Sequence, residues 1–363
     1  MKRLRSGYTT GACAAAAAKG AACAALSGVP PASSDIVFPD GRRVVFTLAG
    51  CGIENADRAT ARCSVIKDAG DDPDVTNGAE IVAEVCIEAT GSKGEGTIAI
   101  LGGEGVGVVT KAGLALPVGS PAINPVPLAM IREAVTEAFR ENGTDAGCFK
   151  VQVTISVPEG RELARYTLNN RLGIVGGLSI LGTTGVVVPL SSAAWTATIT
   201  AAMNVARGMG VKEVVLSTGR TSERAAQTYC RLPEEAYVMM GDYLEFSLKE
   251  AARHEFTRIH LAGMWAKVIK AALHIPQTHV RHGALEPERA VAFLQETSAE
   301  GDGLSYLQGA NSAREIYERL TQRGEVGTIR RVCLAARDYC QSVSRLPVRL
   351  YLVQASGTVV MTV

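Results

Sequence analysis

The chain has 363 residues, of which 47% are hydrophobic and 20% charged, which is the composition of a globular protein with one large or two ordinary domains. With 37 basic and 36 acidic residues the net charge is +1, and aromatic residues make up only 5%. Such a chain lacks the positive field and the stacking side chains typical of nucleic-acid-binding proteins, and its charge does not favour an anionic membrane.

The first predicted element is an alanine-rich helix that begins near residue 10, directly after GYTTG (7–11). Thr9 and Thr10 stand where helix N-caps occur, and the amide groups at a helix N-terminus bind anions. Lys19 and Gly20 interrupt the alanines, and the run is too weakly hydrophobic for a membrane span or a signal peptide. We therefore expect a cytoplasmic protein with an anion site at the start of this helix.

The next residues predict strands and one further helix. Apolar alternation indicates a hairpin over 35–53, with its turn at 39–41, and strands within 59–72, 80–90, 96–113 and 150–160. Residues 127–141 have helical periodicity and stop at Asn142-Gly143. The first part of the chain is therefore predicted to be α+β, with antiparallel strands and two helices.

From residue 166 onward the pattern changes. Short apolar runs at 211–219, 235–242 and 256–264 are each followed by a helical stretch, at 222–230, 243–253 and 264–273. This alternation predicts parallel βαβ units, and 349–363 reads as one or two closing strands. We expect an α+β domain over 1–165 and an α/β domain over 166–363, either separate or interleaved.

An acidic loop at 67–78 carries four carboxylates, of Asp68, Asp71, Asp72 and Asp74. Carboxylates this close resist joint ionisation unless something cationic lies between them. The spacing does not fit a calcium-binding EF-hand, which requires Gly at position six and Glu at position twelve. An acidic surface turn and a ligand-binding loop both stay open, since turns favour Asp and Gly for backbone reasons.

Two glycine-rich loops follow, GGEGVG at 102–107 and LNNRLGIVGGLSILGTTG at 168–185. Glu104 is the only acidic residue of the first loop. Neither loop contains the G-K-[ST] of a phosphate-binding loop or a G-x-G-x-x-G in register. The glycines therefore either let backbone approach a ligand or let backbone pack closely on backbone.

The cysteines and histidines indicate neither a zinc ribbon nor a disulfide framework. Nine cysteines contain no C-x-x-C pair, which favours scattered free thiols. All five histidines lie between residues 254 and 282, and His279 and His282 are three apart. No acidic or thiol partner completes a metal-ligand set around them, so no metal site is predicted.

Taken together, the segments resemble the CbiD family, the cobalt-precorrin-5B C1-methyltransferases of anaerobic cobalamin biosynthesis, over nearly the whole chain. The resemblance rests on six stretches in family order, GYTTGACAAAAAK, KDAGDDPDVTNG, GGEGVGVVTKAGLALPVGSPAINPVP, NNRLGIVGGLSILGTTGVVVPLSSAAW, AKVIKAALH and GANSA. It implies a CbiD-like fold and methyl transfer from S-adenosylmethionine to C1 of cobalt-precorrin-5B, giving cobalt-precorrin-6A. Cobalt enters only as part of this tetrapyrrole substrate.

The chain departs from the family pattern at LHIPQTHVRHGALEPE (273–288), where the family usually has a G-x-F-H-T-H-S stretch followed by an acid. Thr278 and His279 match, but Val280 stands in place of the serine, followed by His282 and Gly283. No role is carried over from the family's histidine-rich turn.

The chemistry implied by the resemblance assigns residues to two ligands. The macrocycle carries acetate and propionate groups, which suit helix N-termini, backbone amides and arginines. The expected substrate-binding residues are Thr9, Thr10, Gly11, Arg171, Gly182, Thr183 and Thr184. The methyl donor calls for a carboxylate that binds its ribose and for backbone that can approach it closely. Its expected residues are Asp68, Gly70, Gly103, Gly105, Gly176 and Gly177, with Asp71, Asp72 and Glu104 as candidate catalytic residues.

Two other functions stay open. Glycine loops with threonines also suit ATP, as in a kinase-like nucleotide- or phosphate-binding enzyme, and a non-catalytic tetrapyrrole carrier would keep the macrocycle site alone. The expected partner is the tetrapyrrole, with no nucleic acid and no membrane. A homo-oligomer and transient contact with neighbouring pathway enzymes are both left open.

Overall fold

The computed structural model describes residues 4–55, 59–90, 94–277, 285–297 and 301–363. The chain divides into two compact units, Met1–Ser191 and Ser192–Val363, later than the expected boundary after residue 165. Residues 166–191 belong to the first unit because two short strands anchor them there. Strand β10 (Ile174–Val175) pairs with β8 (Val108–Val109), and β11 (Val186–Val187) pairs with β1 (Gly7–Tyr8).

The first unit contains a five-stranded sheet and the predicted hairpin. The sheet order is β4 (Gly50–Asn55), β5 (Thr60–Ile66), β6 (Glu80–Ala89), β9 (Phe149–Ser156) and β7 (Thr97–Gly102). Strands β2 (Ser33–Val37) and β3 (Arg43–Thr47) form the hairpin, as predicted. The prediction of antiparallel strands is wrong for β7, which runs parallel to β9. The connection from β7 to β9 contains helix α2, and a crossover of this length permits parallel pairing.

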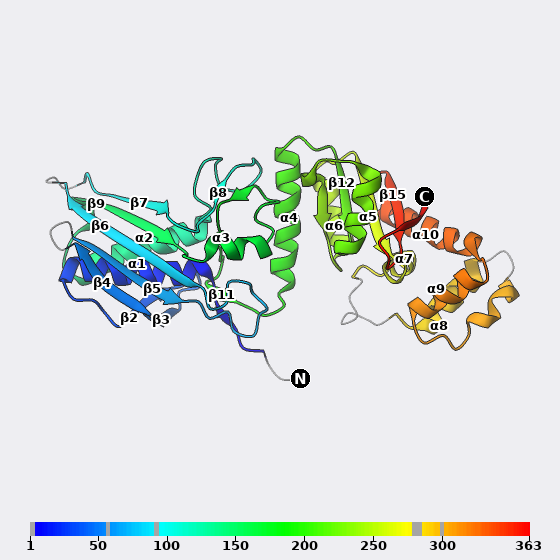
Figure 1. The fold of residues 1–363 in the computed structure, drawn as a ribbon, viewed down its shortest axis with the longest axis horizontal. Helices are drawn as coiled ribbons and strands as arrows, with labels where there is room; N and C mark the ends of the chain where they lie inside the picture. The colour runs from blue at the N-terminus through cyan, green and yellow to red at the C-terminus, as the bar shows by residue number, and fades with distance from the viewer. Residues whose placement is uncertain (1–3, 56–58, 91–93, 278–284, 298–300) are drawn as a thin grey trace. The chain divides into compact units, whose positions relative to one another are not determined.

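Helix α1 (Thr10–Ser27) lies against this sheet on one side and against α2 (Pro125–Glu141) on the other (Figure 1). Almost all of its residues are buried, because alanine side chains let both neighbours approach. At Gly20 a Cβ atom would lie 2.7 Å from Cδ1 of Leu48, so a methyl group there would require the Leu48 side chain to shift. The alanine-rich sequence therefore makes a helix that is buried all round.

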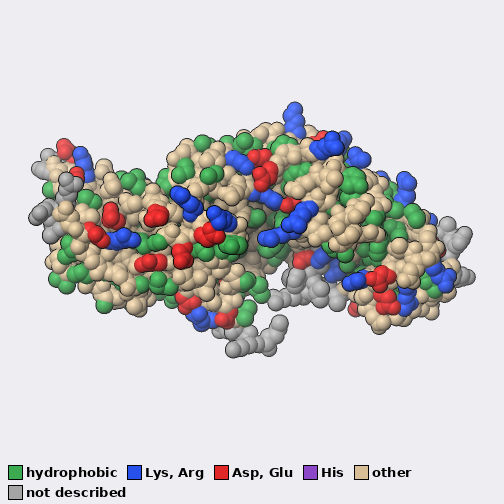
Figure 2. Space-filling model, in the orientation of Figure 1, with side chains coloured by type: hydrophobic (Ala, Val, Ile, Leu, Met, Phe, Trp, Pro, Cys, Tyr) green, Lys and Arg blue, Asp and Glu red, His purple; other side chains and the backbone are tan. Residues whose placement is uncertain are grey.

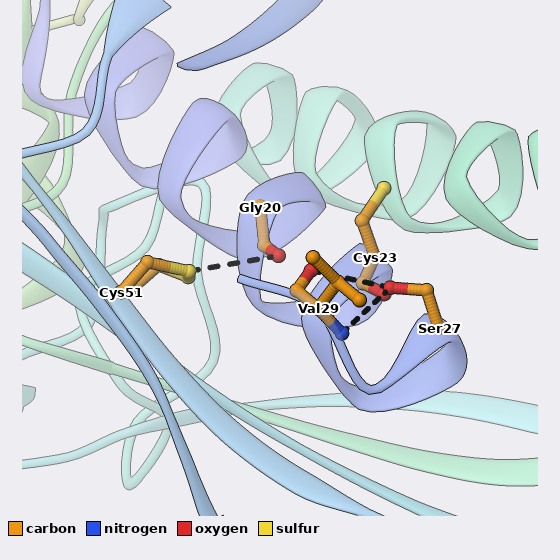
Figure 3. Close-up of a disulfide and its surroundings, with 6 residues drawn as sticks. Gly20, Cys23, Ser27, Val29 and Cys51 are labelled. Carbon is orange, nitrogen blue, oxygen red and sulfur yellow. Dashed lines mark hydrogen bonds between the residues drawn. A yellow bond between two sulfur atoms is a disulfide. The ribbon is translucent and has the colours of Figure 1, made fainter. Parts of the chain in front are cut away.

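The register of β4 and β5 places Cys51 opposite Cys63, and the two form a disulfide. Figure 3 shows Cys51 beside α1, with its sulfur 3.9 Å from the carbonyl oxygen of Gly20. The expectation of free thiols is wrong for this pair, because sequence separation alone does not reveal which residues face each other across strands. The free cysteines of the described residues are Cys13, Cys23, Cys86, Cys148, Cys230, Cys333 and Cys340.

The second unit is built on a largely parallel sheet of order β13 (Tyr237–Met239), β12 (Glu213–Ser217), β14 (Arg258–Met264), β15 (Val348–Val353) and β16 (Val359–Thr362). Only β16 pairs antiparallel. Helices α5 (Arg220–Cys230), α6 (Leu244–Arg253) and α7 (Trp265–Ala272) follow the first three strands in sequence. The predicted βαβ units and closing strands are thereby confirmed.

The remaining helices complete the second unit. Helix α4 (Ser192–Gly208) opens it, and α8 (Pro287–Thr297), α9 (Ala313–Gln322) and α10 (Val326–Ser344) lie between β14 and β15 in sequence. Helices α8, α9 and α10 were not predicted from the sequence. Among the described residues no helix is long and apolar enough to cross a membrane. Figure 2 shows acidic and basic side chains interspersed over the face drawn, in keeping with the net charge of +1.

Candidate binding site in the first unit

Three segments far apart in sequence meet at the N-terminal end of α1: residues 5–11, the acidic loop 67–78 and the loop 181–190. The amide of Tyr8 donates to the carbonyl of Asp68 (2.7 Å), and the amide of Thr9 donates to that of Gly185 (3.0 Å). A Cβ atom on Gly7 would lie 2.1 Å from the carbonyl carbon of Ala69. Glycine at position 7 therefore lets the acidic loop lie directly on the start of the chain.

The predicted N-cap is confirmed, and it binds within the chain. The Thr9 hydroxyl accepts from the amide of Ala12 (3.2 Å), while the amide of Gly11 donates to the carbonyl of Leu181 (2.9 Å). The Thr10 hydroxyl lies within hydrogen-bond distance of both the amide and the carbonyl of Leu181 (2.8 and 3.1 Å). The helix start is thus bonded to the loop 181–185, and the amides of Gly11 and Ala12 are already used.

Loop 181–185 closes over the cap in a conformation that requires glycine. Gly182 has φ +137°, and a Cβ atom there would lie 2.2 Å from the hydroxyl oxygen of Thr9. Thr183 and Thr184 are exposed, and Thr184 accepts from the amide of Val186 (3.3 Å). The structure therefore places Gly182 against Thr9, and Thr183 and Thr184 follow Gly182 in the same loop. The role of these residues in binding stays a prediction.

Two cationic side chains form ion pairs with the acidic loop, as expected for carboxylates that lie close together. The Arg5 guanidinium bonds both oxygens of Asp68 (2.5 and 2.8 Å), and this contact lowers the Asp68 pKa to about 2. Lys67 is buried and forms an ion pair with Asp74. Burial of Asp74 raises its pKa, but the charge of Lys67 and the hydrogen bonds of Lys67 and Thr76 outweigh this and lower it. The loop therefore supplies one cation itself, Lys67, and the N-terminal segment supplies the other, Arg5.

The two remaining carboxylates bind backbone amides. Asp71 accepts from the amide of Arg5 (2.6 Å), and Asp72 accepts from the amide of Leu190 (2.9 Å). Asp72 thus ties the acidic loop to the far end of the loop 181–190. The described residues contain no group of three or more His, Cys, Asp or Glu side chains that could hold a metal ion.

A second cluster joins the loops 102–107 and 173–178. The amide of Leu178 donates to the carbonyl of Gly105 (2.8 Å), and the amide of Gly107 donates to that of Leu178 (2.9 Å). Gly105 has φ +69°, and its Cβ atom would lie 1.8 Å from the carbonyl oxygen of Val157. A Cβ on Gly177 would lie 2.2 Å from the carbonyl oxygen of Gly105. These glycines pack backbone on backbone, which was one of the two interpretations left open.

The other residues of this cluster differ from one another. A Cβ on Gly103 would lie 2.2 Å from the hydroxyl oxygen of Ser156, whereas nothing lies within 4 Å of a Cβ on Gly176. Glu104 is exposed, and its carbonyl accepts from the amide of Val157 (2.8 Å). Only Gly176 and Glu104 therefore face open space, and the predicted donor-binding role of the group stays a prediction.

Arg171 lies beside this cluster together with a cation that the sequence analysis missed. The ammonium of Lys111 donates to the carbonyl of Arg171 (3.2 Å), and the Thr110 hydroxyl donates to the carbonyl of Gly173 (2.7 Å). Both cationic side chains are half-buried. The signal for Lys111 was its place in GVVTKAG, a stretch already included in the family resemblance.

Many of the exposed large apolar side chains of the first unit belong to the segments 101–118 and 166–190. Proteins expose large apolar side chains singly, but a concentration of them marks a binding surface. The exposed apolar side chains of the segments 101–118 and 166–190, called the loop apolar surface below, are Leu101, Val108, Val118, Tyr166, Leu168, Val175, Leu181, Val188 and Leu190.

The histidine-rich stretch lies in the second unit. Thr278, His279, Val280, His282 and Gly283 fall outside the described residues. Within the described residues, ring nitrogens of His260 lie near Tyr351 Oη (3.0 Å) and Glu213 Oε2 (2.8 Å), and those of His254 near the Glu250 carbonyl and Asn204 Oδ1 (both 2.8 Å). His274 stacks on Tyr339. These three histidines have partners within the protein.

The comparisons with known proteins cover both units. Residues 1–189 match the model of the CbiD family. The cobalt-precorrin-5B C(1)-methyltransferase of Desulfotalea psychrophila is 52% identical, over 98% of this chain and 97% of that protein. The enzymes of the same name from Geobacter metallireducens and Geobacillus kaustophilus are 45% and 44% identical, over 99% and 89% of this chain and 98% and 84% of their own. A crystal structure of the cobalamin biosynthesis protein CbiD from Archaeoglobus fulgidus is 27% identical, over 88% of this chain and 85% of that one, with a TM-score of 0.40.

Proposed function

The chain belongs to the CbiD family, and we propose that it transfers a methyl group to C1 of cobalt-precorrin-5B. The observation that carries this proposal is the 52% identity to the Desulfotalea psychrophila enzyme over 98% of the chain, which includes both compact units. The kinase-like enzyme and the non-catalytic carrier are not favoured, since three relatives that each cover most of the chain carry the name of this methyltransferase.

The methyl donor of the proposed reaction is S-adenosylmethionine. The methyl group leaves a sulfonium sulfur, which keeps the electron pair of the broken bond, while a new bond forms to C1. The product is cobalt-precorrin-6A. Such an in-line displacement depends mainly on positioning the two reactants, so a Ser-His-Asp or Cys-His set is not needed. The cobalt ion belongs to the substrate.

For the macrocycle, the arrangement of loops in the first unit supports a binding surface. A tetrapyrrole presents a broad apolar ring with a fringe of carboxylates, which calls for apolar contact and cationic or amide donors. The loop apolar surface supplies the apolar contact, and Arg171 and Lys111 supply the cationic donors. Thr183 and Thr184 add exposed hydroxyl groups, and Gly182 adds backbone atoms that no side chain covers at that residue. Thr9, Thr10 and Gly11 then act by holding this loop in place.

For the acidic loop, the contacts support a positioning role. Asp72 holds the amide of Leu190, and Asp68 and Asp71 hold Arg5. The prediction that the acidic and glycine loops bind the donor has a direct test in the double variant Asp71→Asn, Asp72→Asn. Unchanged affinity for S-adenosylhomocysteine together with unchanged turnover would reject both the donor-binding and the catalytic role of these two residues.

The proposed function is tested by incubating the protein with cobalt-precorrin-5B and S-adenosylmethionine labelled at its methyl group. We expect the label on C1 of the macrocycle, located by NMR of the product. Label on another carbon would contradict the proposed site of transfer. Macrocycle binding without transfer would favour the carrier, and binding of ATP in place of S-adenosylhomocysteine would favour the nucleotide-binding enzyme.

A further inference from the structure

One polar side chain closes the base of the loop that carries Arg171. Asn169 is buried, with 7% of its surface exposed, although asparagine is mostly an exposed residue. Its side-chain amide donates to the carbonyl of Gly177 (3.2 Å), and its side-chain oxygen accepts from the hydroxyl of Ser179 (3.3 Å). These two contacts join residue 169 to residues 177 and 179, so the residues between them form a closed loop, called the loop 169–179 below.

The backbone of Asn169 takes part in the same closure. Its carbonyl accepts from the amide of Ile174 (2.8 Å), and its amide donates to the hydroxyl of Thr167 (3.2 Å). Ile174 belongs to β10, which has two residues and pairs with the equally short β8. Because strands this short add few hydrogen bonds, the conformation of the loop depends on side-chain contacts as well.

The apolar support of the loop 169–179 is also small. Residues 172–174 contribute to a cluster apart from the main core of the first unit, formed by Val109, Ala122 and Ile174 with Leu114, Leu116 and Leu172 packed against it. The loop contains Gly173 and Gly176, both with positive φ, and glycine backbone is conformationally permissive. A segment with few buried apolar contacts opens easily, so a buried polar contact at its base has a large influence on its position.

The loop 169–179 holds Arg171 between two sets of contacts. The ammonium of Lys111 donates to the carbonyl of Arg171 (3.2 Å), and the hydroxyl of Thr110 donates to the carbonyl of Gly173 (2.7 Å). The loop is thus held by residues 110–111 at positions 171 and 173, and by Asn169 at positions 177 and 179. A change at either set of contacts changes where the guanidinium of Arg171 can reach.

The carboxamide of asparagine fits this place because it carries a donor and an acceptor in one planar group. Alanine would leave the Gly177 carbonyl and the Ser179 hydroxyl without these partners. Aspartate would keep the acceptor but lose the donor, and it would place a charge against the Gly177 carbonyl. The adjacent Asn170 is exposed, so the two asparagines of NNR (169–171) have different environments.

We propose that Asn169 is a positioning residue for the macrocycle. It fastens the loop 169–179 so that the guanidinium of Arg171 meets a carboxylate of the substrate. An arginine binds a carboxylate through two parallel N–H bonds of defined geometry, so the position of the loop decides the strength of this contact. The inference rests on the proposed function and deepens it, since Arg171 touches the macrocycle and Asn169 acts through Arg171.

The test is calorimetric titration of the full chain with cobalt-precorrin-5B. Asn169→Ala is expected to weaken binding about tenfold, as much as the loss of the Arg171 contact itself. In a chain that already carries Arg171→Ala, the same substitution should weaken binding less than about twofold, because residues that act through one contact are not additive. Affinity for S-adenosylhomocysteine should stay at the wild-type value in all these variants.

Asn142→Ala is the matched control. Asn142 also donates from its side chain to a backbone carbonyl of the first unit, that of Ala138 (2.8 Å), but it lies at the C-terminal end of α2. Its loss should lower the thermal midpoint and leave macrocycle affinity unchanged. Folding of the first unit is followed by far-UV circular dichroism, since both tryptophans, Trp195 and Trp265, lie in the second unit.

If Asn169→Ala does not fold, Ser179→Ala removes only one of the two side-chain contacts and should weaken macrocycle binding about twofold to fivefold. Wild-type macrocycle affinity in the folded variant overturns the inference. A full tenfold loss in the Arg171→Ala chain also overturns it, because Asn169 would then act independently of Arg171, as does an equal loss of affinity for S-adenosylhomocysteine.

The same samples separate this inference from the proposed function. Methyl transfer by the wild type leaves the proposed function standing when the inference fails. A wild type that binds cobalt-precorrin-5B without methylating it overturns the proposed function alone, and a wild type that does not bind it overturns both.

Discussion

The two units of this protein place their loops by different means. In the first unit the loops lie on one another through glycines and backbone hydrogen bonds, as where Gly105 packs on Val157 and where the amide of Gly11 donates to the carbonyl of Leu181. In the second unit the loops that follow the strands lie together because the strands are parallel and their order reverses beside β12. The glycines of the first unit therefore serve mainly to let backbone pack on backbone, whereas the second unit gathers its loops through the order and direction of its strands.

The two units also differ in how their helices are buried. Helix α1 is buried all round and carries one cation, Lys19, held by Asp35, Glu137 and Glu141 at 2.8–3.0 Å. Burial works to lower the Lys19 pKa, but these three carboxylates raise it above its usual value. Helices α5 and α6 instead bury only part of their residues and leave others exposed. The first unit thus depends more heavily on individual close contacts.

The largest expected effect is that of Gly105→Ala. The new Cβ atom would lie 1.8 Å from the Val157 carbonyl oxygen in a left-handed backbone conformation. Left-handed strain and overpacking together should lower the free energy of unfolding of the first unit by about 2–5 kcal/mol. Urea unfolding followed by far-UV circular dichroism measures this, and tryptophan fluorescence reports the second unit separately.

Gly176→Ala is the matched control for that variant. Gly176 also has positive φ, at +88°, but nothing lies within 4 Å of its Cβ position. Only the backbone strain applies, about 1–2 kcal/mol. Equal destabilisation by the two variants would contradict the interpretation that Gly105 is required by backbone packing.

Lys19→Met should have the next largest effect on the free energy of unfolding. It removes a cation that is 2% exposed from three carboxylates that are 12–46% exposed; Arg43 still pairs with Asp35 and Glu137, whereas Glu141 loses its ion pair with Lys19. Loss of one partner from a buried ion pair costs about 3–5 kcal/mol, and the partial exposure of the carboxylates reduces this to about 1–3 kcal/mol. The same urea unfolding measures it. Arg42→Met, which breaks only the exposed pair with Asp40, should change little, and an equal effect would refute the special role of Lys19.

Arg171→Ala should act on ligand binding rather than on stability. Losing one charged donor to the carboxylate fringe is expected to weaken macrocycle binding about tenfold. Affinity for S-adenosylhomocysteine should stay unchanged, because Arg171 is assigned to the macrocycle and not to the methyl donor. Arg165→Ala removes an exposed arginine paired with Glu162 and serves as control. A parallel loss of donor affinity in Arg171→Ala would contradict the assignment of Arg171 to the macrocycle alone.

The smallest expected effect concerns the pH dependence of the acidic loop. The Arg5 contact lowers the Asp68 pKa from 3.8 to about 2. The contribution of this pair to stability is therefore present above about pH 4 and is lost as the pH falls towards 2. The difference in thermal midpoint between wild type and Asp68→Asn should shrink over that interval. It should be small throughout, because both side chains are at least half exposed.

Patterns along the sequence were sufficient to predict most of the secondary structure and to identify the family. Alternation of apolar residues identified the hairpin 35–53 and strands β5, β6 and β9, and the βαβ rhythm identified β12, β13 and β14. The cap at Thr9 followed from residue type alone. The parallel pairing of β7 with β9, the disulfide of Cys51 with Cys63 and helices α8 to α10 were missed. The first two are pairings across the sheet, which residue patterns along one strand do not specify.

For the candidate site, the sequence alone determined which residues had unusual chemistry. The close carboxylates of 67–78 required cations, but only the fold showed that Arg5 and Lys67 supply them and that Asp72 holds Leu190. The glycines of 102–107 and 173–177 were open to two interpretations, and only the tertiary structure showed backbone atoms at the Cβ positions of Gly105 and Gly177. The residue types determine which kinds of contact each side chain or backbone group can make. Which of these contacts forms depends on the segments, distant in sequence, that the fold brings next to it.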